Sequence, residues 1–236
     1  MTGPQIVIPM AGRGQRFIDA GYDVPKPFIT VKDDPMIDWV VCNLPSYRRI
    51  FFLVQRNQVE EFSSSLSGYR ESTVVSIDGT TEGAACTVLL AREHLNMDEP
   101  LLVANSDQFL YWFPEHFLWY MEETQADGGI ATFRASDPKW SFALVKEDGT
   151  ILRVAEKLQI SNDATCGVYY FREARMCFEA IGMMIEKDIR TNGEFYLCPA
   201  YNEMIQAGMT VRNYPVPGMI GMGTPEDLEK AETLLK

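Results

Sequence analysis

The sequence is poor in the residues that most often carry out acid–base and covalent chemistry. It has two histidines, His94 and His116, in 236 residues. Its five cysteines are odd in number and form no Cys-x-x-Cys pair, so neither a disulfide framework nor a zinc site is indicated. No apolar run approaches the roughly 20 residues that cross a bilayer, and no basic segment precedes the first apolar stretch. We therefore expect a cytoplasmic protein without a membrane partner, whose chemistry runs without histidine.

Positive charge is also scarce. The chain has 21 Lys and Arg against 33 Asp and Glu, which gives a formal net charge of −12 and a pI near 4.7. Such a field repels polyphosphate backbones and anionic surfaces, so nucleic acid is excluded as a partner. The first 30 residues differ, because Arg13, Arg16 and Lys26 outnumber Asp19 and Asp23 there. We expect a small cationic pocket for a compact anion on an acidic body.

The hydrophobic pattern of the first half alternates between two periods. Strands are predicted at residues 5–9, 50–54, 73–77, 101–104 and 129–133. Helices are predicted between them at residues 35–44, 58–66, 83–95 and 114–125. Strands that alternate with helices predict a three-layer α/β fold of the Rossmann-like kind, whose mainly parallel sheet is covered on both faces.

After residue 134 the pattern changes. Antiparallel strands are predicted at residues 142–145, 151–155 and 166–171, followed by helices at 173–186 and 195–207 and a strand at 211–216. The last helix starts with Thr224 as its N-cap and Pro225 at its first position. We predict a single domain, residues 1–236, whose second half, 135–236, adds an antiparallel insert to the parallel first half, 1–134.

A glycine-bearing loop follows the first strand. In parallel α/β sheets, ligands bind beyond the carboxyl ends of the strands, which is where this loop must lie. Gly12 and Gly14 let backbone N–H groups approach an anion, and Arg16 and Lys26 can add charge-assisted bonds to phosphate oxygens. A dinucleotide-binding fingerprint would need glycine in place of Phe17, and a Walker loop is absent. The loop is either a polyphosphate cradle or an ordinary turn.

The first strand, the Gly-x-Gly-x-Arg loop and the Pro-Lys that follows resemble the signature of the sugar-phosphate nucleotidylyltransferases, also called NTP transferases, over nearly the whole chain. Members of this family have a GT-A-like α/β fold and join an NTP to a phosphorylated metabolite. The resemblance implies that Arg16 binds the β- and γ-phosphates, that Lys26 neutralises the α-phosphate, and that residues 1–134 bind the nucleotide and 135–236 the acceptor. It places five loop residues in the nucleotide site: Met10, Ala11, Gly12, Arg13 and Gly14.

A carboxylate ends the predicted strand at residues 101–104. A hard oxygen ligand there suits Mg²⁺, which is commonly held by one or two carboxylates and substrate phosphates. The resemblance implies that Asp107 is this metal-binding, catalytic residue and that Ser106 lies in the nucleotide site; a turn cap is the alternative role of Asp107. The family often has a second metal-binding Asp where this chain has Gly221. Either Asp227 or another carboxylate substitutes for it, or Asp107 and the phosphates hold the ion with waters. Capping of the last helix is the alternative role of Asp227.

The segment from Glu82 to Val88 resembles the part of the family that contacts the base, through Gly83 and Ala84. The position five residues before Gly83, which reads the pyrimidine in several members, is Asp78. A carboxylate only accepts hydrogen bonds, so Asp78 favours the exocyclic amine of cytosine, and hence CTP, while guanine stays open. Asp78-Gly79 as a simple turn is the alternative.

The acceptor side rests on a Glu-Lys pair at the end of a predicted strand. The resemblance implies that Lys157 grips the acceptor phosphate and that Glu156 touches acceptor hydroxyls; a solvated surface pair is the alternative. Other family contacts are changed, because Thr165-Cys-Gly167 stands where relatives have Asn-Ala-Gly. The further acceptor-side candidates are Thr165, Gly167, Glu194 and Tyr196. For Glu194 and Tyr196 the alternative role is capping of the helix predicted from residue 195.

Taken together, these residues predict an Mg²⁺-dependent nucleotidyltransferase whose partners are an NTP and a phosphorylated small-molecule acceptor, in the synthesis of surface-polysaccharide precursors; a homodimer is left open. Gly221 and the altered acceptor loop also fit a nucleotide-binding regulatory protein that has lost catalysis. A glycosyltransferase of the same general fold is the third hypothesis. It would normally carry an Asp-x-Asp metal motif, and here Asn105 and Ser106 precede Asp107.

Overall fold

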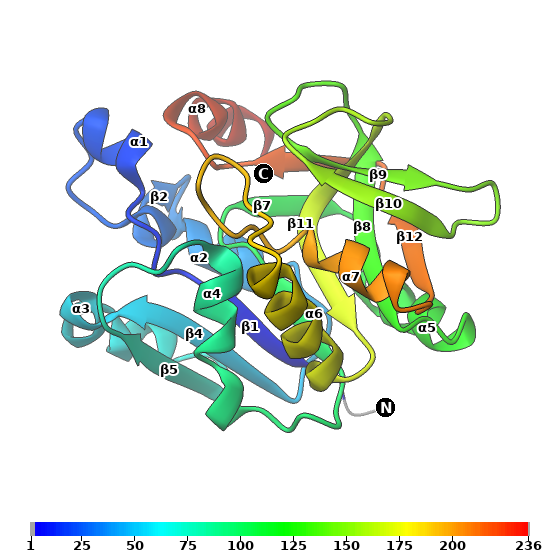
Figure 1. Ribbon diagram of the computed structural model, residues 1–236. Coiled ribbons are helices and arrows are strands. Elements are labelled where there is room, and N and C mark those ends of the chain that lie inside the picture. Colours follow the sequence, from blue (N-terminus) through cyan, green and yellow to red (C-terminus); the bar gives the residue numbers. More distant parts are fainter. Residues whose placement is uncertain (1–2, 236) are drawn as a thin grey trace.

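The computed structural model describes residues 3–235, and its centre is a nine-stranded sheet within that range (Figure 1). The strand order is β10-β9-β11-β6-β1-β4-β5, with β8 paired to β11 and β12 paired to β8. The strands are β1 (Gln5–Pro9), β4 (Arg49–Gln55), β5 (Ser72–Ile77), β6 (Leu101–Ala104), β8 (Gly128–Arg134), β9 (Ser141–Val145), β10 (Ile151–Glu156), β11 (Asp163–Phe171) and β12 (Val211–Pro215).

The sheet is mixed but mainly parallel, which confirms the predicted fold class. Strands β6, β1, β4 and β5 run parallel to one another, as do β8 and β12. Strand β11 is antiparallel to both β6 and β8, and the β9–β10 hairpin extends the sheet beyond it. Ile6, Val7 and Ile8 of β1 are fully buried, because both faces of a central parallel strand are covered.

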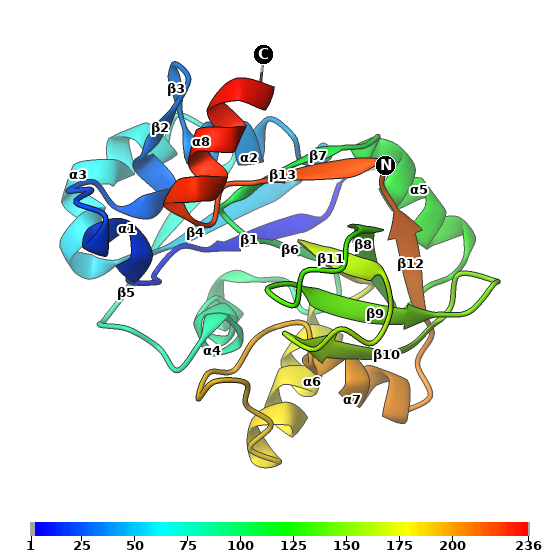
Figure 2. The same ribbon diagram turned by 90° about the horizontal axis from the view of Figure 1, so that it is seen from above.

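Helices cover both faces of the sheet (Figure 2). One hydrophobic cluster joins it to α4, α6 and α7, and a second joins the opposite face to α2, α3, α5 and α8. No helix within residues 3–235 is long and apolar enough to cross a membrane. The helices are α1 (Gln15–Asp19), α2 (Met36–Val41), α3 (Arg56–Leu66), α4 (Ala84–Leu89), α5 (Pro114–Glu123), α6 (Ala174–Glu186), α7 (Ala200–Gln206) and α8 (Pro225–Leu234), with 3₁₀ turns η1 (Lys26–Phe28) and η2 (Arg92–His94).

Two short strands that the sequence analysis missed bring the C-terminal segment to the strand-end carboxylate. β7 (Gln108–Tyr111) pairs antiparallel with β13 (Gly218–Gly221), with Gly221 opposite Gln108. The Met222 N–H then donates to the Asp107 carbonyl at 2.7 Å. Each strand has only four residues, too few for a clear period-2 pattern. Another short pair, β2 (Thr30–Val31) and β3 (Asp34–Pro35), forms a separate hairpin.

The predicted helix over residues 195–207 is wrong at its start, because α7 begins at Ala200. The Phe195 backbone bonds to a distant loop instead of to its own helix: its N–H donates to the Glu82 carbonyl at 2.8 Å, and its carbonyl accepts from the Ala85 N–H at 3.1 Å. The predicted helix over residues 83–95 also divides, into α4 and η2. Non-local backbone pairing of this kind leaves no trace in hydrophobic periodicity.

Candidate active site

Two adjoining cavities lie beyond the carboxyl ends of β1 and β6. The larger has a volume of about 650 Å³ and the smaller about 520 Å³. They share Gly14, Gln15, Ala84 and Glu194 as lining residues, so they are two chambers of one site. Volumes in this range suit small-molecule ligands. The N-terminal loop and the end of β6 meet here because β1 and β6 are parallel neighbours.

The smaller chamber is formed by the glycine-bearing loop on one side and the Thr80–Ala84 segment on the other. Ala11, Gly12, Arg13 and Gly14 line the first side. The Gln55 side chain donates to the Ala11 carbonyl at 2.7 Å and so fixes the start of the loop. Arg13 reaches across to the Thr80 hydroxyl, with its Nη2 3.4 Å from Oγ1. Thr81, Gly83, Ala84 and Thr87 complete the second side.

Three predicted nucleotide-binding residues lie outside both chambers. Met10 is in the core beneath the loop, and Ser106 is buried behind Asp107. Asp78 projects outward, with its side chain 75% exposed, and pairs with Arg56 at 2.6 Å between Nε and Oδ1. A base in the smaller chamber would instead meet the threonines at 80 and 81, which the spacing argument did not single out.

Lys26 and Asp107 form an ion pair in the wall of the larger chamber. Lys26 comes from η1 and Asp107 from the turn after β6, and their side chains are 21% and 24% exposed. Gly223 keeps this pair accessible, since a Cβ there would lie 3.1 Å from Asp107 Oδ2 and 4.0 Å from Lys26 Nζ. Arg16, on the short helix α1, lines the same chamber. The predicted catalytic residues therefore lie together.

The Asp107 carboxylate suits a hard cation whose other ligands are supplied by substrate and water. Within residues 3–235 no group of three or more His, Cys, Asp or Glu side chains could enclose a metal ion by itself. Mg²⁺ is usually held by one or two carboxylates together with waters and substrate phosphates, and Asp107 beside an open cavity provides that arrangement. Asp227 does not present a free carboxylate, because both of its oxygens accept from Lys139, at 2.9 and 3.2 Å. The cap of α8 is Thr224, whose hydroxyl accepts from the Asp227 N–H.

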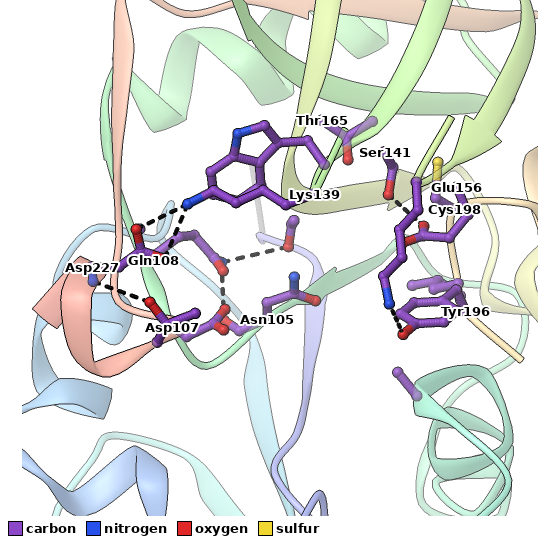
Figure 3. A pocket seen from close by; sticks show the side chains of 18 of the residues that line it. Asn105, Asp107, Gln108, Lys139, Ser141, Glu156, Thr165, Tyr196, Cys198 and Asp227 are labelled. Carbon is purple, nitrogen blue, oxygen red and sulfur yellow. Dashed lines mark hydrogen bonds and ion pairs between the residues drawn. The ribbon is translucent and has the colours of Figure 1, made fainter. Parts of the chain in front are cut away.

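The acceptor-side candidates form the opposite wall of the larger chamber (Figure 3). Lys157 has a left-handed backbone, with φ of 52°, and its N–H donates to the Trp140 carbonyl at 3.1 Å. Its ammonium donates to the Tyr196 hydroxyl and lies 4.4 Å from the centre of that ring. This geometry holds the lysine at the cavity wall. Thr165 and Gly167 line the wall beside it.

Gly167 lies in a β-bulge of β11, where the register against β8 shifts between Thr165 and Tyr169. Its φ is 73°, and a Cβ there would come within 2.4 Å of the Asn105 amide nitrogen. The bulge therefore requires glycine, both for backbone conformation and for space. It also supports the turn that carries Asp107, because the Asn105 N–H donates to the Gly167 carbonyl at 2.9 Å.

Glu156 is the buried carboxylate of the acceptor wall. It accepts a hydrogen bond from the Ser141 hydroxyl. Burial raises the pKa of its carboxyl above the ordinary value, and the Ser141 hydrogen bond and the Lys157 charge only partly offset this. A carboxylate that is buried without a full ionic partner lowers the stability of the folded state. Groups that bind ligands often carry such a cost.

Glu156→Gln should therefore stabilise the protein near neutral pH. The raised pKa means that the folded state holds the proton more tightly than the unfolded state, so the wild type loses stability as the pH rises from about 4 through the raised pKa. We expect the Tm of the variant to exceed that of the wild type by about 2–4 °C at pH 8, the shift that roughly 1 kcal/mol gives in a chain of this length. The difference should vanish near pH 4.

Glu226→Gln is the matched control, because hydrogen bonds at the start of α8 lower the pKa of the Glu226 carboxyl. The Glu226 carboxylate stabilises the folded state, unlike that of Glu156. This stabilisation is present above the unfolded pKa and is lost as the pH falls through the lowered pKa. The control should therefore not gain stability at pH 8. A Glu156→Gln variant that melts below the wild type at pH 8 would contradict the assigned cost of burial.

The segment from Arg190 to Cys198 connects the two chambers. Besides the Phe195 backbone bonds to Glu82 and Ala85, the Arg190 guanidinium pairs with Glu82 at 2.6 Å and stacks on the Phe195 ring at 3.9 Å. Glu194 lines both chambers, and Tyr196 holds Lys157. Residues that would contact the base loop and the acceptor thus follow one another in the three consecutive residues 194–196.

Several cavity residues were missed from the sequence: Asn105, Gln108, Lys139, Trp140, Ser141 and Cys198. Gln108 Oε1 is buried without a hydrogen-bond partner in the described structure. Lys139 and Trp140 precede β9, and a lysine–tryptophan pair directly before a strand was the signal that could have identified them. Ser141 and Cys198 carry no such signal, because their approach depends on packing across the sheet.

Known proteins share the fold of this chain. No family model matches the chain. It is 27% identical over 176 residues to the mannose-1-phosphate guanylyltransferase catalytic subunit beta of Dictyostelium discoideum; the match covers 70% of this chain and 48% of that protein, so the chain spans about half its length. The crystal structure of a nucleoside-diphosphate-sugar pyrophosphorylase from Vibrio cholerae RC9 superposes with a TM-score of 0.83 at 25% identity, over 97% of this chain and 99% of that one. The structure of the inositol-1-phosphate CTP transferase from T. maritima superposes with a TM-score of 0.77 at 17% identity, over 99% of this chain and 96% of that one.

Fold and relatives indicate the class of protein that this chain resembles. It has the fold of the nucleotidyltransferases and is similar in sequence and structure to NTP transferases, the group that includes nucleotide-sugar pyrophosphorylases.

Proposed function

We propose that this protein transfers a nucleotidyl group from an NTP to a phosphorylated small molecule, a sugar phosphate or a similar metabolite, and releases pyrophosphate. The observation that carries the proposal is the accessible Lys26–Asp107 pair in the larger of two connected chambers. One chamber has a glycine-rich, cationic lip suited to a triphosphate. The other has Lys157 on its far wall, suited to a second phosphate.

The reaction balances without a general base. A phosphate oxygen of the acceptor attacks the α-phosphorus of the NTP, a new P–O bond forms, and the bond to the bridging oxygen of pyrophosphate breaks as pyrophosphate leaves. Phosphate monoesters are dianionic nucleophiles near neutral pH, since their second pKa is about 6. Lys26 would stabilise the charge that develops at the α-phosphate, and Arg16 would bind the leaving phosphates. Lys157 would hold the acceptor phosphate in line.

Mg²⁺, bound by Asp107 with substrate phosphates and water, would screen the repulsion between the two anions. The protein groups contribute orientation: the turn after β6 is held by Gly167, and Lys157 is held by Trp140 and Tyr196. Each of these contacts is made before substrate binds, so little reorganisation is needed during transfer.

The base of the NTP is the less constrained part of the proposal. A preference for CTP through Asp78 requires that carboxylate at the base, whereas it lies outside the smaller chamber beside Arg56. The similar proteins named above include a CTP transferase and a guanylyltransferase. CTP stays our first choice for assay, with the threonine-lined rim at residues 80 and 81 and the Gly83 backbone as the proposed base contacts. A cytoplasmic location, a homodimer and a part in surface-polysaccharide synthesis remain predictions.

A pyrophosphate-release screen tests the proposal. The purified protein is incubated with Mg²⁺ and each of CTP, UTP, GTP, ATP and dTTP, crossed against a panel of sugar and polyol phosphates. We expect release that requires both substrates. Triphosphate binding, seen as a rise in Tm, with no release across the panel would support the regulatory hypothesis instead. Absence of both would sink the proposal.

A further inference from the structure

Lys139 is a cavity cation whose position the structure explains in full. It follows Asp137 in a tight turn before β9: the Lys139 N–H donates to the Asp137 carboxylate at 2.9 Å, and the Trp140 N–H donates to the Asp137 carbonyl at 3.2 Å. The turn directs the lysine side chain into the larger chamber, where its ammonium lies 4.6 Å from the centre of the Trp140 ring.

Asp227 holds the lysine ammonium at the cavity wall. Both carboxylate oxygens accept from Nζ, and the Asp227 side chain is 12% exposed while that of Lys139 is 40% exposed. The Asp227 carboxylate is thus buried in the wall, and the Lys139 ammonium faces the cavity. The Trp140 ring also lies close to Gly221, since a Cβ at that position would be 3.1 Å from its Cη2. A side chain at position 221 would therefore require this ring to shift by a few tenths of an ångström.

Lys139 lines the same chamber as Lys26 and Lys157. Figure 3 shows its ammonium between the Asp227 carboxylate and the chamber, on the side of Asp107, with Tyr196 and Glu156 on the opposite wall. The charged lining residues of this chamber balance, with four basic and four acidic side chains: Arg16, Lys26, Lys139, Lys157, Asp107, Glu156, Glu194 and Asp227. The chamber therefore has no net positive charge to spare, and each of its four cations can contribute to holding two anionic substrates.

We propose that Lys139 is a substrate-binding residue, which contacts a phosphate group of the bound substrates from the wall that it shares with Asp107. This inference rests on the proposed function and adds a third lysine to it. The Asp227 carboxylate and the Trp140 ring are the protein groups that contact the ammonium in this wall. A partly exposed lysine with a single ionic partner can form further bonds, because an ammonium has three donors.

The competing role is structural, in which the Lys139–Asp227 pair only fastens the turn before β9 to the start of α8. Two variants separate the roles, since each removes the ion pair but only one removes the cation. Lys139→Met should weaken binding at least tenfold, as an increased KM for the NTP or for the phosphorylated acceptor and as an increased Kd for the NTP in calorimetry with Mg²⁺. Asp227→Asn keeps the cation, so it should change the same constants less than threefold or tighten binding.

Thermal melting of both variants, with Lys139→Arg as the conservative change, completes the experiment. Lys139→Arg should recover most of the affinity that Lys139→Met loses, because arginine also binds phosphate. If Lys139→Met and Asp227→Asn weaken binding equally, or if neither changes it, Lys139 is only structural. A folded wild-type protein that releases no pyrophosphate with any substrate pair contradicts the proposed function itself. In that case the calorimetric Kd for CTP and for GTP still tests Lys139.

Discussion

Asp107→Asn is expected to lower kcat for nucleotidyl transfer by about 10³-fold, the loss typical when a preorganised electrostatic contact at the reacting phosphate is removed. The amide keeps the shape of the side chain and can still accept from Lys26, so the fold should be unchanged. It loses the charge that pairs with Lys26 and that a divalent cation needs. Stopped assays of pyrophosphate release at saturating substrates would measure the change.

Asp78→Asn is the matched control, because Asp78 is also a carboxylate in an ion pair, with Arg56, but lies outside both chambers. We expect its kcat to stay within twofold of the wild type and its order of preference among NTPs to be unchanged. Lys157→Met should behave differently from both, by raising KM for the acceptor far more than KM for the NTP. A fully active Asp107→Asn enzyme would remove Asp107 from the metal site and from catalysis.

Gly83→Ala is expected to damage both stability and nucleotide binding. Gly83 has φ of 133°, and a Cβ there would lie 2.4 Å from the carbonyl oxygen and 2.7 Å from the nitrogen of Phe195. Both are backbone atoms, so a rotamer change cannot relieve the overlap. The extended pairing between residues 82–85 and Phe195 must open, at a cost of about 3 kcal/mol. We expect Tm to fall by about 6–12 °C and the KM for the NTP to rise at least tenfold.

Gly182→Ala provides the control for a glycine change as such. Gly182 lies in α6, and nothing lies within 4 Å of a Cβ built there. Alanine is favoured over glycine inside a helix by about 0.5–1 kcal/mol, so Tm should hold or rise slightly. Scanning calorimetry of the two variants and NTP titrations measure both effects. A Gly83→Ala protein as stable as the wild type would show that the contact between the base loop and the acceptor segment is easily displaced.

The connection between Gly83 and Phe195 has a functional consequence. The same extended segment touches the base loop through Phe195, lines both chambers through Glu194 and holds Lys157 through Tyr196. Damage at Gly83 should therefore also raise the acceptor KM, although Gly83 lies only in the nucleotide chamber. This coupling follows from backbone hydrogen bonds between segments more than 100 residues apart in sequence.

The fold class was predictable because hydrophobic periodicity is a local property. Continuous apolar runs predicted the buried strands β1, β4 and β6, and the structure has them within one or two residues of the expected bounds. The helix over residues 195–207 was wrong at its start for the opposite reason. Its composition favours a helix, but the Phe195 backbone satisfies its hydrogen bonds with Glu82 and Ala85 across the molecule.

The same division applies to the site. Sequence by itself determined the glycine-bearing loop with Arg16 and Lys26, and a carboxylate, Asp107, at the end of a buried strand, since the carboxyl ends of parallel neighbours must share one edge of the sheet. The tertiary structure alone decided that Asp78 faces solvent beside Arg56 and that Lys139 enters the cavity against Asp227. Spacing along a chain sets which residues follow a strand, but the direction of a loop side chain depends on partners that arrive from distant parts of the sequence.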